Sequence, residues 1–241
     1  MTARIPPKGA PWRNFHGRIK GKALRPNQEA WLDEDLGRLS PGPVGWDVNP
    51  DRHPIELKEY FGDREIWLEI GFGGGEHMVH QAVQTPDVGI IGCEPYINGV
   101  AMLLGKIRTA NARNIAVYPG DVRNMFDVLP EASIARAFLL YPDPWPKKRH
   151  HKRRLVQPSL AALVADRLEP GGLLWAATDW AEYAEWIVEV LDAEPQLERE
   201  RAPRVDDPDS LDEAGRPRTR FEARGLRLGH RVWDLRYRRK R

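Results

Sequence analysis

The sequence predicts an α/β fold in which helices cover both faces of a mostly parallel sheet. Short apolar runs alternate with amphipathic stretches along most of the 241 residues, which is the pattern of repeated strand–helix units. Glycines or carboxylates follow successive apolar runs, and open α/β sheets bind their ligands at the edge where such strand ends meet. The length suffices for one such domain with a sizeable core and appended segments.

The apolar runs set the expected order of the elements. The expected strands are 65–70, 88–94, 114–119, 134–141, 173–178, 195–201 and about 227–238. The expected helices are a short one within 29–45, another at 54–61, and longer ones at 76–84, 95–112, 152–168 and 180–192. Glu169-Pro170-Gly171-Gly172 is a stop signal for the helix before it. Residues 202–218 are rich in Pro, Asp and Arg and are expected to form a long loop.

Charge is distributed unevenly along the chain, although the net charge is only +2. Residues 1–28, 147–154 and 216–241 hold 24 of the 37 Lys and Arg and only two acids. The rest of the chain therefore carries 13 basic and 33 acidic residues. An acidic body with three basic segments predicts a directed surface for a polyanion such as RNA or DNA. The alternative, three solvated flexible segments, suits the two terminal segments taken alone.

Several classes of protein are disfavoured by composition. No run of about 18 apolar residues is present, so no membrane span is expected. The N-terminus is basic but lacks the apolar core of a signal peptide. Cys93 is the only cysteine, which excludes an intrachain disulfide and a Cys-based metal site. The seven His show no ligand spacing, and His77 with His80 is expected to be a solvated pair. We expect a cytoplasmic protein without a metal.

A glycine-rich turn follows the first strand. Gly71, Gly73 and Gly75 separate the expected strand 65–70 from the helical stretch 76–84. Glycines permit a tight turn and let a ligand approach the backbone, while the helix N-terminus offers free N–H groups. Such a turn alone is weak support for a ligand site, because many nucleotide-binding folds contain one.

Acidic residues lie at the ends of other strands. Glu94 ends the second strand, where a carboxylate can accept both hydroxyls of an adenosine ribose; capping the next helix is its alternative role. Asp121 follows the third strand and can contact the amino edge of an adenine, although Asp is also a common turn former. With Glu69, Asp143 and Asp179, these residues are expected to converge at one edge of the sheet.

The stretch Leu139–Arg154, LLYPDPWPKKRHHKRR, combines a stiff loop with dense positive charge. Three prolines within five residues enclose Asp143 and Trp145, and six Lys or Arg follow. Proline lacks a backbone donor and fixes φ, so the strand must end in a rigid loop. This pattern favours a site where an aromatic, polyanionic substrate meets chemistry over a plain surface turn with a solvated basic run.

Two nucleotide-binding folds compete for the first strand and its turn. A nicotinamide-binding domain requires G-x-G-x-x-G, whereas the glycines here run G-x-G-x-G after Glu69. The pattern E-x-G-x-G-x-G, with acids ending the next two strands, resembles the class I methyltransferases that use S-adenosylmethionine.

Four segments together resemble the bacterial tRNA (guanine-N7)-methyltransferase family. They span residues 69 to about 237 in the family's order, and the last two are the most diagnostic. The segments are EIGFGGGEH (69–77), GCEPY (92–96), YPDPWPKKRHHKRR (141–154) and TRFEARGLRLGHRVWDLRY (219–237). GRIKGKALRP (17–26) also resembles the family's N-terminus.

The resemblance implies a Rossmann-like class I methyltransferase fold with a seven-stranded, mostly parallel sheet and an antiparallel last strand. It divides the chain into a basic, flexible N-terminal arm (1–45) and a methyltransferase domain (46–241). The implied reaction moves a methyl group from S-adenosyl-L-methionine to N7 of guanine 46 in the variable loop of tRNA. The partner is therefore tRNA, with no membrane and no metal; the choice between monomer and homodimer stays open.

The resemblance also assigns residue roles. Asp143 is expected to be the catalytic carboxylate. The expected cofactor-binding residues are Glu69, Gly71, Gly73, Glu94, Asp121 and Asp143. The expected substrate-binding residues are Lys147, Asp179, Thr219, Arg220, Phe221 and Glu222. The expected RNA-binding residues are Arg149, His150, His151, Lys152, Arg153 and Arg154. Trp145 is expected either to stack on a base or to cover the core.

Three other functions stay open at this point. The chain can be a methyltransferase for another RNA, such as rRNA or an mRNA cap, because the charge pattern does not distinguish RNAs. It can be an RNA-binding module without catalysis, although such a module needs neither the glycine turn nor the acids at strand ends. A nicotinamide-dependent dehydrogenase fits least well.

Overall fold

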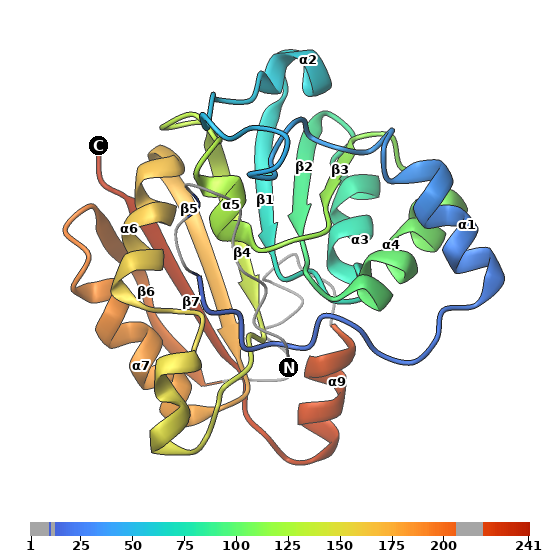
Figure 1. Ribbon diagram of the computed structural model, residues 1–241. Coiled ribbons are helices and arrows are strands. Elements are labelled where there is room, and N and C mark those ends of the chain that lie inside the picture. The colour runs from blue at the N-terminus through green and yellow to red at the C-terminus, as the bar shows by residue number, and fades with distance from the viewer. Residues whose placement is uncertain (1–9, 11–12, 206–218) are drawn as a thin grey trace.

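The structure, a computed structural model, describes residues 10, 13–205 and 219–241 (Figure 1). Its sheet has seven strands in the order β3-β2-β1-β4-β5-β7-β6. The strands are β1 (Glu65–Ile70), β2 (Val88–Cys93), β3 (Ile115–Tyr118), β4 (Ile134–Leu140), β5 (Leu168–Thr178), β6 (Leu197–Val205) and β7 (Trp233–Arg239). Strands β1 to β5 pair in parallel, and β7 runs antiparallel to both of its neighbours. The predicted sheet is therefore confirmed.

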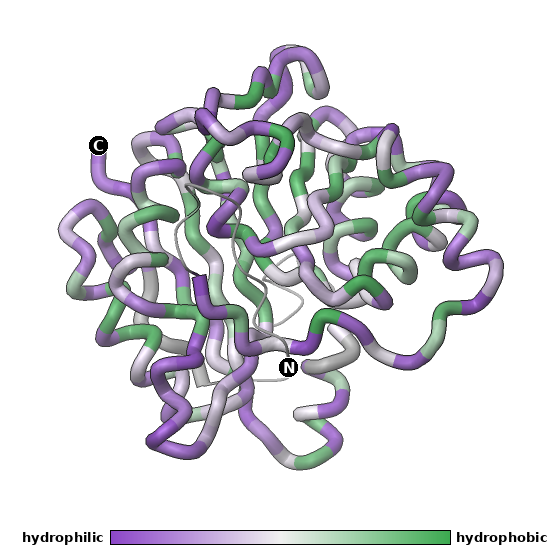
Figure 2. The backbone as a smooth tube through the Cα atoms, in the orientation of Figure 1, coloured by the Kyte–Doolittle hydropathy of each residue, from purple (hydrophilic) through white to green (hydrophobic). Residues whose placement is uncertain are grey.

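Helices cover both faces of this sheet, as predicted. They are α1 (Pro26–Asp35), α2 (Leu57–Phe61), α3 (Glu76–Gln84), α4 (Ile97–Ala110), α5 (Val122–Phe126), α6 (Pro158–Arg167), α7 (Ala181–Asp192) and α9 (Arg220–Arg227), with a 3₁₀ helix, η1 (Lys148–Arg153). Apolar side chains of α3 and α4 pack on one face, and those of α5, α6 and α7 pack on the other. Figure 2 shows hydrophobic central strands between more hydrophilic outer segments. Parallel strands that are buried on both faces have continuous apolar sequences. The sequence therefore predicts them.

The helix expected at 152–168 begins later than predicted. It starts at Pro158, and the basic residues Lys148–Arg153 form η1 instead. Proline is favoured in the first turn of a helix and disfavours helical backbone at the residue before it, so Gln157 stays extended with φ −133° and ψ 160°. The basic run therefore folds separately from α6.

The final strand, expected at about 227–238, begins later than predicted, and a helix that was not predicted precedes it. Arg220–Arg227 form helix α9, and β7 begins only at Trp233. The hydroxyl of Thr219 accepts a hydrogen bond from the backbone N–H of Glu222 at 3.2 Å. T-x-x-E is a helix start signal, but no apolar period follows it to reveal the helix.

Other boundaries differ by a few residues. Strand β5 begins at Leu168 instead of residue 173, and the ladder between β4 and β5 shifts register between Ile134 and Arg136 to accommodate the added residues. Residues 202–205 belong to β6, and the remainder of the predicted loop, 206–218, lies outside the described residues. Among the described residues, no helix has the length and apolar composition that a membrane span requires.

Candidate functional site

The loops that carry the predicted site residues meet at the carboxyl edge of the sheet. Backbone hydrogen bonds continue the ladder past the strand ends: Gly71 N donates to Cys93 O at 2.8 Å, and Tyr141 N donates to Ala177 O at 2.7 Å. The glycine turn after β1 and the Pro-Asp-Pro-Trp loop after β4 are thus neighbours, because β1 and β4 pair in parallel. The convergence expected from the sequence follows from this strand order.

Glu94 is fixed by two backbone N–H groups. Its Oε2 accepts from Gly73 N at 2.8 Å, and its Oε1 accepts from Tyr96 N at 2.9 Å. Tyr96 is the residue before α4, so one of these bonds is the helix-capping alternative weighed for Glu94. These two bonds hold the Glu94 carboxylate against the glycine turn.

Glu69 forms a buried hydrogen-bonded row with α3. Its Oε2 lies 2.7 Å from His77 Nδ1, and His77 Nε2 lies 3.2 Å from the side-chain nitrogen of Gln81. These partners fit an imidazole whose proton sits on Nδ1 and is donated to Glu69. The expectation of a solvated pair is wrong for His77, which is 2 % exposed, and right for His80, which is exposed. The His77 side chain can contact Glu69 because α3 begins immediately after the glycine turn that follows β1.

Asp121 caps helix α5. Its Oδ1 accepts from Arg123 N at 2.9 Å, and its Oδ2 pairs with the Arg123 guanidinium at 2.5 Å. This is the turn-forming role that the sequence left open beside adenine recognition. The contact with adenine stays a prediction, and it would have to share the carboxylate with Arg123.

Asp143 differs from these carboxylates. Its side chain reaches solvent, and among the described residues none donates a hydrogen bond or forms an ion pair to it. Partial burial still raises the pKa of the Asp143 carboxyl, because desolvation disfavours its charged form. Tyr141 and Trp145 on either side have positive φ values of 55° and 45°, which are uncommon for residues with a Cβ. The loop is thus held in a strained shape around a carboxylate that has no partner in the described part of the chain.

The predicted substrate-binding residues divide into two groups. Asp179, after β5, accepts from or pairs with His230 Nδ1 at 3.0 Å, and Gly225 of α9 packs so closely that an added Cβ would lie 2.6 Å from Asp179 Oδ2. Thr219 and Glu222 are buried at the start of α9, and Lys147 is exposed beside the loop. The side chains of Arg220 and Phe221 lie outside the described part of the chain. His230 was missed because a single His carries no sequence signal.

The predicted RNA-binding run is not uniform. Arg149 and Lys152 are exposed, and the guanidinium of Arg153 lies 5.1 Å above the Trp145 ring. Burial and nearby cations lower the pKa of His150. His151 Nε2 lies 3.3 Å from Glu182.

Arg154 is the exception within this run. Only 3 % of the residue is exposed, and its Nε donates to the carbonyl of Pro144 at 2.9 Å. Such burial favours a structural role over the direct RNA contact expected for Arg154, because a contact with phosphate requires an accessible guanidinium.

Part of the basic N-terminal segment crosses the carboxyl edge (Figure 1). Arg13 forms two hydrogen bonds with Asp127 at 2.6 and 2.7 Å, and the His16 ring lies 6.5 Å from the Trp145 ring. Farther along, Gly21 N donates to Asn98 Oδ1 at 2.7 Å, and Ile19 O accepts from Ile97 N at 2.9 Å. The backbone makes several of these contacts, so side-chain patterns did not predict them. The boundary of the predicted arm at residue 45 stays a prediction, and residues 1–9, 11 and 12 lie outside the described residues.

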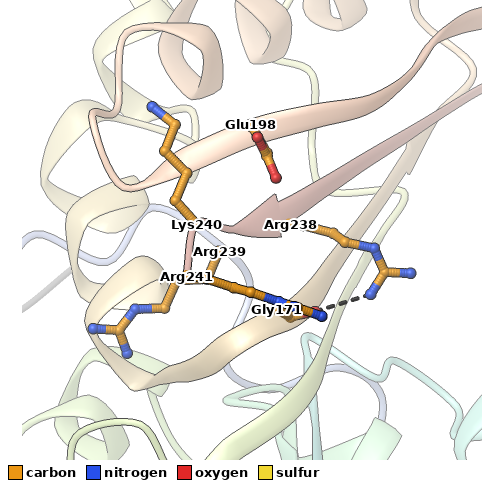
Figure 3. Close-up of a pocket in the computed structure, with 6 residues that line it drawn as sticks. All are labelled: Gly171, Glu198, Arg238, Arg239, Lys240 and Arg241. Atoms are coloured by element: carbon orange, nitrogen blue, oxygen red, sulfur yellow. Dashed lines mark hydrogen bonds between the residues drawn. The ribbon is translucent and has the colours of Figure 1, made fainter.

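A pocket lies at the other end of the sheet. Figure 3 shows it lined by Gly171, Glu198 and the C-terminal residues Arg238–Arg241. It adjoins the beginning of β5, whereas Asp179 follows the end of that strand, and its Arg238 already donates to the Gly171 carbonyl at 2.9 Å. This pocket is therefore separate from the candidate site. The described residues also contain no cluster of three or more His, Cys, Asp or Glu suited to a metal ion.

Comparison with known proteins identifies the family. Residues 63–235 match the protein family described as "Putative methyltransferase". A tRNA (guanine-N(7)-)-methyltransferase of Ruegeria pomeroyi is 63 % identical over 179 residues, which cover 74 % of this chain and 76 % of the relative. That of Paracoccus denitrificans is 50 % identical over 220 residues, covering 91 % of each chain. This chain belongs to the tRNA (guanine-N7)-methyltransferase family. The resemblance noted from its motifs is thereby confirmed.

Solved structures outside this methyltransferase family share its fold. The 16S rRNA methyltransferase KamB has a TM-score of 0.57 at 14 % identity, covering 77 % of this chain and 93 % of KamB. An antibiotic-related methyltransferase has a TM-score of 0.53 at 15 % identity, covering 76 % of this chain and 91 % of the other. The predicted class I methyltransferase fold is confirmed by these likenesses, which concern the fold alone.

Proposed function

We propose that this protein transfers a methyl group from S-adenosyl-L-methionine to N7 of guanine 46 in the variable loop of tRNA. The observation that carries the proposal is the meeting of three family motifs at one edge of the sheet. The glycine turn, the Glu94 carboxylate and the Asp143 loop lie on adjacent parallel strands of a chain that belongs to the tRNA (guanine-N7)-methyltransferase family.

The residues at the glycine turn suit such a methyl donor. Gly71 has a φ of +73°, and a Cβ added there would meet no atom within 4 Å, so open space adjoins the turn. Glu94, which accepts from Gly73 N, and Glu69, two residues before Gly71, supply carboxylates, which accept from hydroxyl and ammonium groups. We assign the donor to Glu69, Gly71, Gly73, Glu94 and Asp121.

The reaction requires little acid–base catalysis by the protein. S-adenosylmethionine, when bound, supplies a methyl group on a cationic sulfur, which the lone pair of guanine N7 can attack without prior loss of a proton. The residues of the chain therefore act mainly by holding the base in line, an effect that can supply about 7–11 kcal/mol in favourable cases.

Asp143 is suited to stabilise the base as positive charge develops on it. A carboxylate that lacks protein donors can accept hydrogen bonds from guanine N1–H and the exocyclic amino group. Its partial desolvation, which raises its pKa, also strengthens its interaction with a developing positive charge.

The exposed part of the basic run supports binding of the tRNA backbone. Arg149, Lys152 and Lys147 lie next to the Asp143 loop in the sequence and are exposed. Guanine 46 must leave its stacked position to reach Asp143, which costs on the order of a few kcal/mol. Phosphate contacts by these cations can offset that cost.

A binding experiment tests the donor site. Glu94→Ala removes the carboxylate that faces the glycine turn, and Glu59→Ala removes an exposed carboxylate of α2 as a control. Isothermal titration with S-adenosylmethionine should give a higher Kd for Glu94→Ala and an unchanged Kd for Glu59→Ala. The wild-type protein should be stabilised against heating by S-adenosylhomocysteine and not by NAD. An unchanged Kd for Glu94→Ala would remove Glu94 from the donor site, and stabilisation by NAD alone would overturn the proposal.

A further inference from the structure

Arg154 stands out within a run of otherwise accessible basic residues because it is buried. Its side chain retains 1 % of its accessible surface, whereas Arg149 and Lys152 are exposed. Its Nε donates to the carbonyl of Pro144 at 2.9 Å, which places the bond ten residues back along the chain, between Asp143 and Trp145. The guanidinium therefore ties the end of η1 to the middle of the Asp143 loop.

The surroundings of the guanidinium offset part of the cost of its burial, and among the described residues none accepts a hydrogen bond from its Nη2. Its carbon lies 5.0 Å from the Tyr183 ring and 6.0 Å from the Trp186 ring, both on α7. Nη2 lies 3.6 Å from Glu182 Oε1, a residue of the same helix. Aromatic faces and a nearby carboxylate are the partners that offset desolvation of a cation. Arg154 thus bridges α7, which packs on the sheet, and the loop.

The loop needs such an outside support. Its three prolines have no N–H groups, so the loop can form few hydrogen bonds of its own. The positive φ values of Tyr141 and Trp145 cost free energy, and such backbone persists only where the surroundings hold it in place. The Arg154 bond to Pro144 joins the loop between these two strained residues.

We infer that Arg154 is a positioning residue for the Asp143 loop and not a contact for RNA. The catalytic part of this inference rests on the proposed function. Loss of the bond to Pro144 frees the loop, which moves the Asp143 carboxylate relative to the base. A displacement of about 1 Å can cost roughly 100-fold in rate. The positive charge of Arg154 is secondary in this role, whereas the position of its Nε–H is essential.

Two substitutions separate the position of the donor from the charge. In Arg154→Gln the amide nitrogen takes the place of Nε and can still donate to Pro144, but the charge is lost. In Arg154→Lys the charge remains, but a methylene group takes the place of Nε. A positioning role predicts that kcat falls more in Arg154→Lys than in Arg154→Gln. A contact with phosphate predicts the reverse order. Arg113→Lys, the same change at an exposed residue outside the site, serves as the control.

Three measurements complete the test: kcat with saturating tRNA, the salt dependence of tRNA affinity, and hydrogen exchange of the peptide covering 139–147. We expect Arg154→Lys to lower kcat by at least about tenfold, within the range that small displacements produce. Its salt slope should stay that of the wild type, while Arg149→Ala lowers the slope by about 1. The loop amides should exchange faster in Arg154→Lys than in the wild type or in Arg113→Lys.

The outcomes distinguish this inference from the proposed function. Higher kcat in Arg154→Lys than in Arg154→Gln, or a salt slope reduced as in Arg149→Ala, would overturn the positioning role. Unchanged exchange of the loop amides in Arg154→Lys would overturn it as well. An inactive wild type whose loop exchange still rises in Arg154→Lys would contradict the proposed reaction and leave the support of the loop established. Hydrogen exchange is measured on the folded protein and does not require methyl transfer. It therefore tests the support of the loop even if the protein is inactive.

Discussion

The carboxylates at the carboxyl edge are held in different ways. Glu69 and Glu94 accept hydrogen bonds from His77 and from backbone N–H groups, and Asp121 is paired with Arg123. Asp143 has no such donor among the described residues. Carboxylates that are hydrogen-bonded within the protein have fixed positions and can shape a ligand site. A carboxylate without protein donors can instead bind the reacting guanine. The difference predicts opposite effects of substitution on stability.

Asp143→Asn should abolish methyl transfer and stabilise the folded protein at neutral pH. The pKa of the Asp143 carboxyl is raised by desolvation, so its ionisation costs folding free energy above the raised pKa. Below its ordinary pKa of 3.8 the group is neutral in both states and the cost disappears. Thermal unfolding should therefore show a higher Tm for Asp143→Asn at pH 7 and no difference at sufficiently low pH. Asp63→Asn, at an exposed residue paired with Lys58, should not raise the Tm at pH 7; a lower Tm for Asp143→Asn at pH 7 would contradict the assignment.

His77→Leu should destabilise the protein because it leaves the Glu69 carboxylate buried without its donor. Loss of one partner of a buried polar group costs about 1–3 kcal/mol, and more when the group is charged. Urea unfolding should show this loss, whereas His80→Leu at the exposed neighbour should change stability by less than about 0.5 kcal/mol. Equal stability of the two variants would mean that the His77–Glu69 bond contributes nothing.

At the scale of elements, the glycine turn joins β1 to α3 through backbone that only glycine adopts easily. Gly75 precedes α3 with a φ of 76°, and a Cβ there would lie 2.4 Å from Leu103 Cδ1 of α4. The turn therefore sets both the entry of α3 and its distance from α4.

Gly75→Ala should destabilise the protein by more than Gly171→Ala. Both glycines have positive φ, 76° and 84°, which costs a residue with a Cβ roughly 1–2 kcal/mol. Only Gly75 adds a clash, since a Cβ at Gly171 meets nothing within 4 Å. Denaturant unfolding of the two variants measures the difference. A cost at Gly75 no larger than that at Gly171 would show that α3 and α4 separate freely.

Elements with a strong apolar pattern could be predicted from the sequence, and those without one could not. Strand 65–70 and helix 76–84 have the predicted bounds because burial imposes their pattern. Helix α9 was missed because a cap at Thr219 and tertiary contacts, not an apolar period, specify it. Motif matches indicated where the candidate site lies, but they did not reveal that Arg154 is buried, since burial depends on the distant Tyr183 and Trp186.

At the scale of the whole molecule, two of the three basic segments lie at the end of the sheet that carries the candidate site, whereas Arg238–Arg241 of the third lie at the other end. The N-terminal segment crosses the carboxyl edge, and η1 adjoins the Asp143 loop. The rest of the chain is predominantly acidic, so the N-terminal segment and the basic run after the Asp143 loop provide the positive charge that attracts tRNA to this edge.

Joint substitution of Arg149 and Lys152 by Ala should weaken tRNA binding most at low salt. Each lost phosphate contact lowers the slope of log affinity against log salt concentration by about 1. Filter binding across a salt series measures this slope. Lys58→Ala, at an exposed lysine of α2 that pairs with Asp63, should leave it unchanged. A slope unaltered by the double substitution would show that the run is a solvated surface.

The central claim is that the Asp143 loop and the glycine turn form one site for methylating guanine N7 in tRNA. Incubation of the wild-type protein with labelled S-adenosylmethionine and an unmodified tRNA transcript, followed by cleavage specific for 7-methylguanosine, tests it most directly. We predict one cleavage product, at guanine 46 in the variable loop, and none with Asp143→Asn. Label on another nucleotide, or on guanine 46 with undiminished yield in Asp143→Asn, would contradict the claim.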